Sequence, residues 1–268
     1  MKLQFDAVEH KYTTLNKPED VWTSVTSLIS KFKAPFDKLA VAKKSVKKKN
    51  SKWYGMKPEE VIKVWDNETN RALTLGSWYH DQREEQLLAC NTLERHGKAL
   101  DIMKPITDGD IKLSPDQNVT DGIYPEHLVY LRSAKICGQA DRVEIVNGVV
   151  NIYDYKTNKE IKTEPYVNWE GVRSTLNSPL EHIDDCNLMH YALQLSCYMY
   201  MIMKHNHNLK PGVLEIHHIV FEVESYDEHG YPITATDDRG EPIVKEVVPY
   251  ELPYLRKEVI AMINHLKK

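Results

Sequence analysis

The sequence is poor in cysteine, and its few cysteines lie far apart. Only four occur in 268 residues, and none of them forms a CxxC pair: Cys90, Cys137, Cys186 and Cys197. This spacing argues against a zinc-ribbon site and against a disulfide framework. So few thiols are typical of a protein from a reducing compartment, and we therefore expect a cytoplasmic protein.

Long apolar runs and an excess of basic residues are also lacking. The most apolar stretch, Leu188 to Met203, is interrupted by His190 and Gln194 and is short for a bilayer span. The first ten residues lack the apolar core of a signal peptide. Lys and Arg number 35 against 39 Asp and Glu, a net charge of −4, which counts against nucleic-acid binding through bulk charge. We expect a soluble protein without membrane contact.

The patterns of apolar and turn residues predict a domain with both helices and strands. A hairpin is expected in residues 1–14, with its turn at Glu9-His10. Gly76 is expected to mark a helix break or a close approach, and residues 101–125 are expected to form a loop. The predicted helices start at Thr23 or Ser24 and end at Phe32, start at Pro58 and continue through Tyr79, and cover about 187–205 and 252–267. The predicted strands cover about 127–134, 137–146, 149–156 and 213–224.

The sharpest chemical signal is the segment GQADRVEIVNGVVNIYDYKTNK, residues 138–159. Asp141 lies on the first strand of a hairpin that turns at Asn147-Gly148. Asp154 and Lys156 share one face of the second strand because side chains alternate. Both aspartates lie equally far from the turn, so their carboxylates pair and repel each other unless a cation lies between them. Such oxygen ligands suit Mg²⁺. By itself, the pattern also fits a salt bridge on a hairpin surface.

Two further pairs of polar residues lie one helical turn apart. His80 and Glu84 share one face of the predicted helix that begins at Pro58, and Gln194 and Tyr198 share one face of the 187–205 helix. A buried amide such as that of Gln194 needs a hydrogen-bond partner. On their own, these residues fit a surface His–Glu pair and an amide that bonds to the backbone.

The joint occurrence of these elements resembles one nuclease superfamily. Their order is similar to that of the RecB-type branch of PD-(D/E)XK nucleases, particularly the compact exonucleases of bacteriophages. SVTSLI at 24–29 is similar to the N-terminal segment of the same phage group. The matching motifs, which together span 76–198, are Gly76-x3-His80-x3-Glu84, Gly138-x2-Asp141, Asp154-x-Lys156 and Gln194-x3-Tyr198.

The resemblance implies a restriction-endonuclease-like α+β fold, with a central mixed sheet flanked by helices. We expect residues 1–268 to form one nuclease domain with a core at about 70–224. An N-terminal helical region at about 15–70 and a C-terminal hairpin and helix at about 225–268 would decorate this core.

The resemblance also implies roles for individual residues. The expected catalytic residues are Asp141, Asp154, Lys156, His80, Gln194 and Tyr198. The expected metal ligands are His80, Asp141, Asp154, Tyr155 and Glu126, the last from its place at the start of the preceding strand. We expect Mg²⁺ or Mn²⁺, because a nitrogen ligand makes Mn²⁺ as acceptable as Mg²⁺. No Cys follows Cys197 and there is no P-loop, so neither an iron–sulfur cluster nor ATP is expected.

A basic run precedes the motifs and offers a second kind of contact. Its lysines could bind phosphates while Trp53 stacks on a base. A solvated helix face is the alternative explanation. The candidate DNA-binding residues are Lys43, Lys44, Lys47, Lys48, Lys49 and Trp53.

The sequence therefore predicts a metal-dependent DNA exonuclease that acts on single- or double-stranded ends in the cytoplasm of a bacterium or a phage-infected host. A structure-specific endonuclease and a non-catalytic DNA-binding module on a nuclease fold are the alternatives. A purely structural protein would leave the motifs unexplained. Polarity, strand preference, activity on RNA and oligomeric state stay open.

Overall fold

The central sheet is built around a hairpin that turns at Asn147-Gly148. Strands β10 (Ile136–Val146) and β11 (Val149–Lys156) run antiparallel on either side of this turn. The two turn residues have φ values of 52° and 73°, as a type I′ turn requires. The predicted hairpin is confirmed in the computed structural model, which describes residues 2–266.

The remaining strands extend this hairpin into a mixed sheet. Strand β9 (Gly122–Leu131) pairs antiparallel with β10, and the short β4 (Thr23–Ser24) pairs parallel with the start of β10. On the other side, β12 (Lys210–Phe221) runs parallel to β11, and β15 (Val244–Glu251) closes the edge antiparallel to β12. The expected α+β class with a central mixed sheet is confirmed.

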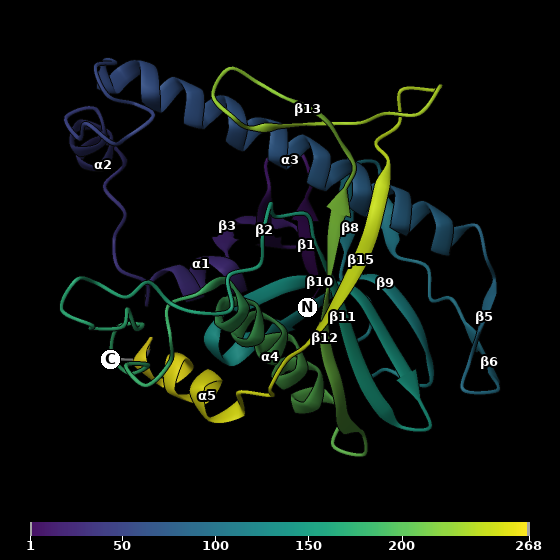
Figure 1. Cartoon of the computed structure of the whole chain (residues 1–268). Coiled ribbons are helices and arrows are strands. Elements are labelled where there is room, and N and C mark those ends of the chain that lie inside the picture. The colour runs from purple at the N-terminus through teal and green to yellow at the C-terminus, as the bar shows by residue number, and fades with distance from the viewer. Residues whose placement is uncertain (1, 267–268) are drawn as a thin grey trace.

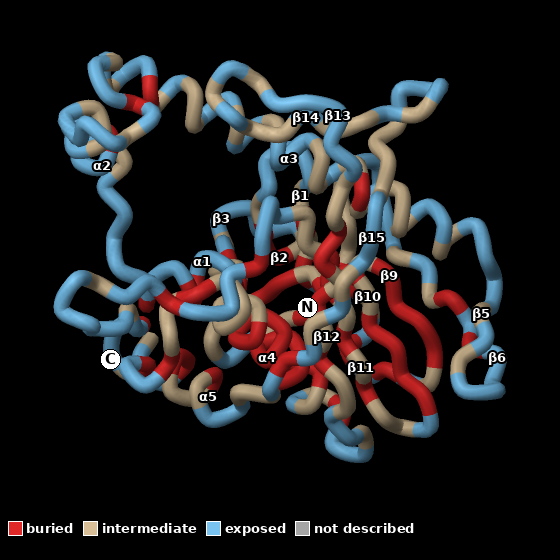
Figure 2. Tube along the Cα trace, viewed as in Figure 1, coloured by how far each residue is buried: buried red, intermediate tan, exposed pale blue. Residues whose placement is uncertain are grey.

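Helix α4 (Asn187–His205) makes the crossover that the parallel pair β11–β12 needs. Every residue from Ala192 to Ile202 is buried, because α4 packs on the sheet and also contacts α1 (Val25–Ser30) and α5 (Arg256–His265). A helix that is apolar on all sides has to be covered on all sides. Figure 2 shows the resulting buried centre around α4, β10 and β11. None of the described helices is long and apolar enough to cross a membrane.

Helix α3 (Pro58–Leu88) has 31 residues and extends well beyond the sheet (Figure 1). Its N-terminal part packs with α2 (Lys38–Ser45) around Trp53, Val61 and Ala42. Its C-terminal part contacts β9. We call the α2–α3 structure of residues 38–72 the arm. The tip of the hairpin β13 (Val223–Tyr226) and β14 (Pro232–Thr234) touches the arm, since Lys52 Nζ donates to the carbonyl of His229 over 2.6 Å.

A second sheet lies beside the first and contains the N-terminal hairpin. Its strands follow the order β3 (Lys17–Val21), β2 (Lys11–Thr14), β1 (Leu3–Asp6), β8 (Ile111–Leu113) and β7 (Ile106–Asp108). The expected hairpin in 1–14 is confirmed. A separate small hairpin consists of β5 (Thr92–Arg95) and β6 (Lys98–Asp101).

Two expectations about the elements need correction, and of the two alternatives at Gly76 the close approach is confirmed. Residues 101–125 are not a loop, because β7, β8 and the start of β9 lie there. Helix α3 is not broken at Gly76, although the backbone does come close to another segment at this point: a Cβ on Gly76 would lie 3.1 Å from Thr157 Oγ1. The strand expected at 127–134 is shifted, since β9 ends at Leu131 and residues Arg132–Ala134 form a short 3₁₀ helix. For the closing helix, residue 267 lies outside the described residues.

Candidate active site

The hairpin brings Asp141 and Asp154 together, as the spacing predicts. Arg142 is paired with Tyr153, so Asp141 lies opposite Asp154 in the same register. The Tyr155 N–H donates to Asp141 Oδ2 over 2.7 Å. Both aspartates are buried, with 9 % of Asp141 and 1 % of Asp154 exposed. The structure therefore contains two adjacent carboxylates out of water.

Lys156 and Gln194 hold the Asp154 carboxylate from two sides. The Lys156 ammonium forms an ion pair with Asp154 Oδ2 and lies 4.9 Å from the ring centroid of Tyr191. Gln194 Nε2 donates to Asp154 Oδ1 over 3.2 Å and to the Tyr198 hydroxyl over 3.1 Å. Helix α4 thus presents Gln194 and Tyr198 to the end of β11, where the DxK motif lies.

Tyr198 reaches this position only because residue 138 is a glycine. A Cβ on Gly138 would lie 2.5 Å from Tyr198 Cε1, closer than two carbon atoms can approach. The glycine of the G-x2-D motif therefore has a packing reason: it lets helix α4 come close to strand β10.

His80 and Glu126 complete a cluster around Asp141. His80 Nδ1 lies 3.4 Å from Asp141 Oδ2. Glu126 lies opposite Asp141, because the flanking residues of β9 and β10 pair as Pro125 with Arg142 and His127 with Ala140. One ligand atom each from His80, Glu126 and Asp141 lies within 4.8 Å of the others. These residues come from α3, β9 and β10, so the cluster depends on the tertiary fold.

Glu126 has an unusual backbone conformation for a residue within a strand. Its φ is +47°, in the left-handed region that non-glycine residues other than Asn and Asp rarely adopt. Such strain persists only where the surrounding structure imposes it, and it concentrates at functional sites. Pro125 and His127 flank Glu126 on β9 and are both buried, so the strand holds Glu126 in this state.

The residues present fit a divalent cation. The cluster offers one imidazole nitrogen and two carboxylates, a donor set that suits Mg²⁺ and Mn²⁺. The buried Asp154 Oδ2 receives no hydrogen bond of regular geometry from the described residues and faces only the Lys156 ammonium. The Tyr155 ring packs against both Tyr79 and His80, with ring centroids 5.5 and 5.8 Å apart. Its hydroxyl accepts a hydrogen bond from Arg142 over 3.4 Å, so the main chain of Tyr155 is the part better suited to a cation.

Without a cation, the carboxyl groups repel one another strongly enough to change their pKa values. Burial and the Asp141 charge raise the pKa of Glu126 to about 8. The same two effects raise the pKa of Asp154 to about 6, against the pull of Lys156. Burial also acts to raise the pKa of Asp141, but His80, Lys156 and the Tyr155 N–H hold it below its usual range. Asp141 is thus the carboxylate that stays ionised.

The basic groups respond to the same charges. Burial acts to lower the pKa of His80, but Asp141 outweighs it and raises that pKa to about 9. Lys156 follows the same logic: burial opposes its charge, while Asp154 and Asp141 raise its pKa. His127 follows Glu126 in the chain, but burial is what acts on its imidazole, and burial lowers its pKa to about 4.

The cluster opens into a groove with a volume of about 990 Å³. One wall is the face of α3 that carries Ala72, Gly76 and His80, and the hairpin β1–β2 contributes Phe5 and Tyr12. The segment after β11, residues 157–159, forms another part of the wall. A long polymer can therefore lie along the cluster.

Two residues at the cluster were not expected from the sequence. Lys112 Nζ lies 3.0 Å from Glu84 Oε2 and 3.7 Å from Glu126 Oε2, and the Gln139 amide donates to Glu126. Gln139 could have been noticed, because it stands inside the G-x2-D motif. Lys112 has no such signal, since it comes from a strand in a region that resembles a loop.

The basic run lies in and after α2, away from the groove. Lys43 and Lys44 lie in the last turn of α2, and no residue of the run is among the described residues that line the groove. Trp53 is only 6 % exposed and packs edge-on against Trp65 at 6.1 Å. In this structure Trp53 is a core residue of the arm, whereas the neighbouring Tyr54 is exposed.

A comparison with protein-family models gives one match. The model of the PD-(D/E)XK nuclease superfamily matches residues 54–266, from the arm to α5. The chain belongs to the PD-(D/E)XK nuclease superfamily. No curated protein matches the chain.

Membership of the PD-(D/E)XK superfamily confirms the coarser part of the expectations. The chain is a nuclease with a restriction-endonuclease-like fold, and nucleases of this superfamily use divalent metal ions. The superfamily match includes α3, β9, β10, β11 and α4, and thus every element of the cluster around Asp141.

Proposed function

We propose that this protein is a Mg²⁺- or Mn²⁺-dependent DNA exonuclease that hydrolyses phosphodiester bonds. The observation that carries the proposal is the convergence of His80, Glu126 and Asp141 within 4.8 Å at the floor of a large groove. The resemblance to compact bacteriophage exonucleases favours DNA ends as the substrate. It also favours a role in phage-type DNA recombination, replication or end processing in the cytoplasm.

His80, Glu126, Asp141 and Asp154 would hold the cation, and Tyr155 would add to this set at most through its main chain. A divalent cation at this site would polarise the scissile phosphodiester and lower the pKa of the attacking water. Asp141 is suited to bind first, because its pKa is held low, whereas the pKa of Glu126 is raised to about 8 and that of Asp154 to about 6.

Lys156 is the proposed catalytic cation. Its ammonium lies next to Asp154 at the end of β11, on the edge of the groove. A fixed positive charge there stabilises the negative charge that develops on the phosphoryl oxygens during hydrolysis. Gln194 and Tyr198 position this charge indirectly, because the Gln194 amide fixes the other oxygen of Asp154.

The basic run of the arm would provide a weaker, sequence-independent contact. Lys43, Lys44 and Lys47–Lys49 carry positive charge on a part of the molecule that extends beyond the sheet (Figure 1). Because Trp53 is buried, the exposed Tyr54 is the better candidate for base stacking next to the run.

The test uses end-labelled single- and double-stranded DNA, both linear and circular, and a labelled RNA. Each is incubated with the wild type and Lys156→Ala in Mg²⁺, Mn²⁺ or EDTA. Metal-dependent release of nucleotides from linear DNA only, with a loss of about 100-fold or more in Lys156→Ala, supports the proposal. Lys162→Ala is the matched control, because Lys162 is an exposed lysine whose ammonium pairs, among residues 2–266, with Glu160 alone.

The other outcomes separate the alternatives. Cleavage of circles or of branched substrates would make the protein an endonuclease. Tight DNA binding without cleavage, unchanged in Lys156→Ala, would contradict the enzyme and support a binding module.

A further inference from the structure

A second cavity lies beside the catalytic cluster, and no step of the proposed hydrolysis uses it. Its volume is about 290 Å³, and it lies between β9 and the chain on both sides of β8. We call it the β9 pocket. Its apolar walls come from residues of low flexibility and from side chains of the core, namely Pro105, Pro115, Pro125, Met103, Leu113 and Leu128. The volume is at the small end of the range for small-molecule sites, which begins at about 300 Å³.

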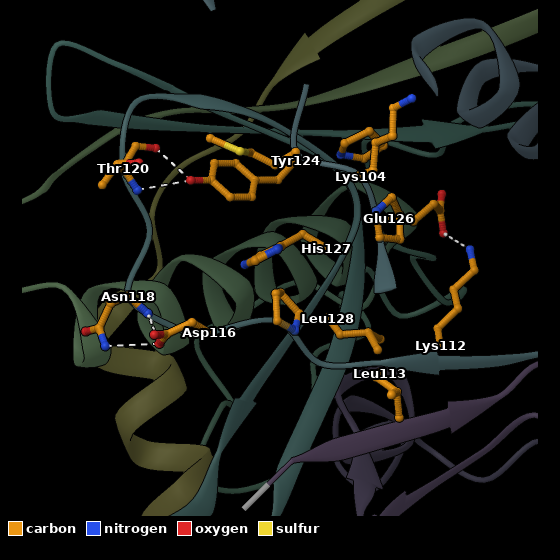
Figure 3. A pocket seen from close by; sticks show the side chains of 14 residues that line it. Lys104, Lys112, Leu113, Asp116, Asn118, Thr120, Tyr124, Glu126, His127 and Leu128 are labelled. Carbon is orange, nitrogen blue, oxygen red and sulfur yellow. Dashed lines mark hydrogen bonds and ion pairs between the residues drawn. The ribbon is translucent and has the colours of Figure 1, made fainter. Parts of the chain in front are cut away.

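The β9 pocket shares a wall with the catalytic groove. Lys112 and Glu126 line both cavities. Figure 3 shows the Glu126 carboxylate pointing away from the centre of the pocket towards Lys112, whereas His127 points into the pocket. Glu126 and His127 are adjacent on β9 and both line the β9 pocket, and Glu126 also lines the groove. A group in the pocket therefore lies next to Glu126, at the edge of the cluster around Asp141.

His127 has no hydrogen-bond partner among the described residues, although it is only 4 % exposed. Its ring makes an edge contact with Tyr124, whose ring centroid is 5.1 Å away. A neutral imidazole has one donor and one acceptor, and neither ring nitrogen of His127 is fully enclosed by the described residues, so both can be reached from the pocket. The ring is therefore available for a ligand with both an acceptor and a donor.

The rim of the pocket adds polar groups of both signs. Asp116 and Asn118 form a turn, in which Asp116 Oδ1 accepts from the Asn118 N–H and Nδ2 at 3.0 Å. Lys104 is exposed and has no ion-pair partner among the described residues. In Figure 3, His127 lies between Tyr124 and the Asp116–Asn118 turn, with Lys104 at the other end of the pocket.

We propose that the β9 pocket binds a nucleobase, that of the nucleotide next to the phosphate at the catalytic cluster. The flat prolines and the rings of Tyr124 and His127 suit a planar heteroaromatic group, and the His127 imidazole matches the donor and acceptor on the edge of a base. The shared wall at Lys112 and Glu126 puts the sugar–phosphate of that nucleotide at the cluster. Lys104 would then bind a flanking phosphate.

The inference rests on the proposed nuclease function and adds a subsite to it. The same chemistry has two sources: a base in the bound strand or the base of a released nucleoside monophosphate. The experiment has one arm for each source, and the variants are His127→Leu, which removes the donor and acceptor, and His127→Gln, which keeps one of each. His207→Leu serves as the control, because His207 is exposed and its side chain forms no hydrogen bond or ion pair with the described residues.

The first arm uses labelled oligonucleotides in which a single abasic residue is moved across the positions next to the cleaved bond. The wild type should cleave about tenfold more slowly when one particular base is missing, the usual loss for one bound base. His127→Leu should cleave intact and abasic strands at equal rates, and His127→Gln should restore part of the difference. The ratio is measured within each variant, so a general loss of activity or of metal affinity does not change it. His207→Leu should behave as the wild type.

Equal rates for all abasic positions in the wild type, or a penalty that His127→Leu keeps in full, would overturn the substrate subsite. The second arm titrates dAMP, dCMP, dGMP and dTMP into the protein with Ca²⁺ by calorimetry. Binding that His127→Leu abolishes, without any abasic penalty, supports base recognition and assigns the pocket to the product. If no substrate is cleaved, the nuclease proposal fails, and the second arm alone decides: no nucleotide binding then overturns the pocket as well.

Discussion

The Gln194 amide donates to Asp154 Oδ1 over 3.2 Å, across 40 residues of the chain. This bond occupies one oxygen of Asp154 and leaves the other, Oδ2, to face Lys156. The orientation of the carboxylate is thus set by helix α4, which lies on the buried side of the sheet. The position of Lys156, the proposed catalytic lysine, depends in turn on a helix whose residue Gln194 does not line the groove.

Removing the amide should impair catalysis more than folding. We expect Gln194→Leu to lower the rate of cleavage by about 10- to 100-fold, the usual loss when a residue that orients a metal ligand is replaced. Stability should change little, because Gln194 is surrounded by apolar residues of α4. Single-turnover kinetics and urea unfolding check the two parts. Gln86→Leu, the same change at an exposed position of α3, should have no effect on the rate.

Metal binding should release protons at neutral pH. The pKa of Glu126 is about 8 and that of His80 about 9 in the absence of a cation, so both groups are largely protonated at pH 7 and must lose their protons to become ligands. The Mn²⁺ affinity should rise steeply from pH 6 to 8 and level off above pH 9. Calorimetry in buffers with different ionisation enthalpies counts the protons. Glu126→Gln should release fewer, and an affinity that is flat from pH 6 to 9 would contradict the cluster as a metal site.

Without metal, the folded protein should lose stability as the pH rises. Glu126 keeps its proton to about pH 8 in the folded state, against 4.5 for an ordinary glutamate, and His80 to about 9, against 6.5. The folded state therefore binds more protons than the unfolded chain between these values, and the free energy of unfolding falls with rising pH. Each group contributes at most about 1.4 kcal/mol per pH unit. Urea midpoints in EDTA from pH 5 to 9 test this, and saturating Mn²⁺ should remove the decline.

A methyl group on residue 138 should separate α4 from the sheet. Its Cβ would lie 2.5 Å from Tyr198 Cε1, so we expect Gly138→Ala to cost about 1–3 kcal/mol of stability, as overpacking usually does. Activity should fall as well, because Tyr198 accepts a hydrogen bond from Gln194. The double variant with Tyr198→Ala should be more stable than the sum of the single effects predicts. Strict additivity of the two changes would show that the contact is absent.

The hairpin and the cluster on it could be predicted because the signals are local. Asn147-Gly148 determines the register, and the register alone puts Asp141 beside Asp154. Helix α4 could be predicted equally well, because its sequence is apolar on every face. Gln194 stood out there as a polar residue in an apolar helix, and its partner is a residue that the sequence had already singled out.

What was missed depends on contacts between distant parts of the chain. Strand β8 has only three residues and is held by β1, more than one hundred positions earlier, so its own sequence resembles a loop. Lys112 on β8 was missed for the same reason. Trp53 follows a basic run and resembles an exposed stacking residue, yet it is covered by Trp65 and by His229 from the far end of the chain.

Helix α3 runs without a break from the arm to the cluster around Asp141. Val61 belongs to the core of the arm and His80 to the cluster, and the helix between them spans about 28 Å. If a bound DNA strand tilted the arm, the His80 imidazole at the other end of α3 would move. DNA binding and cation binding would then be linked, and each would change the affinity for the other by the same factor. Gly76, where an added Cβ would lie 3.1 Å from Thr157 Oγ1, is the point about which such a tilt would turn.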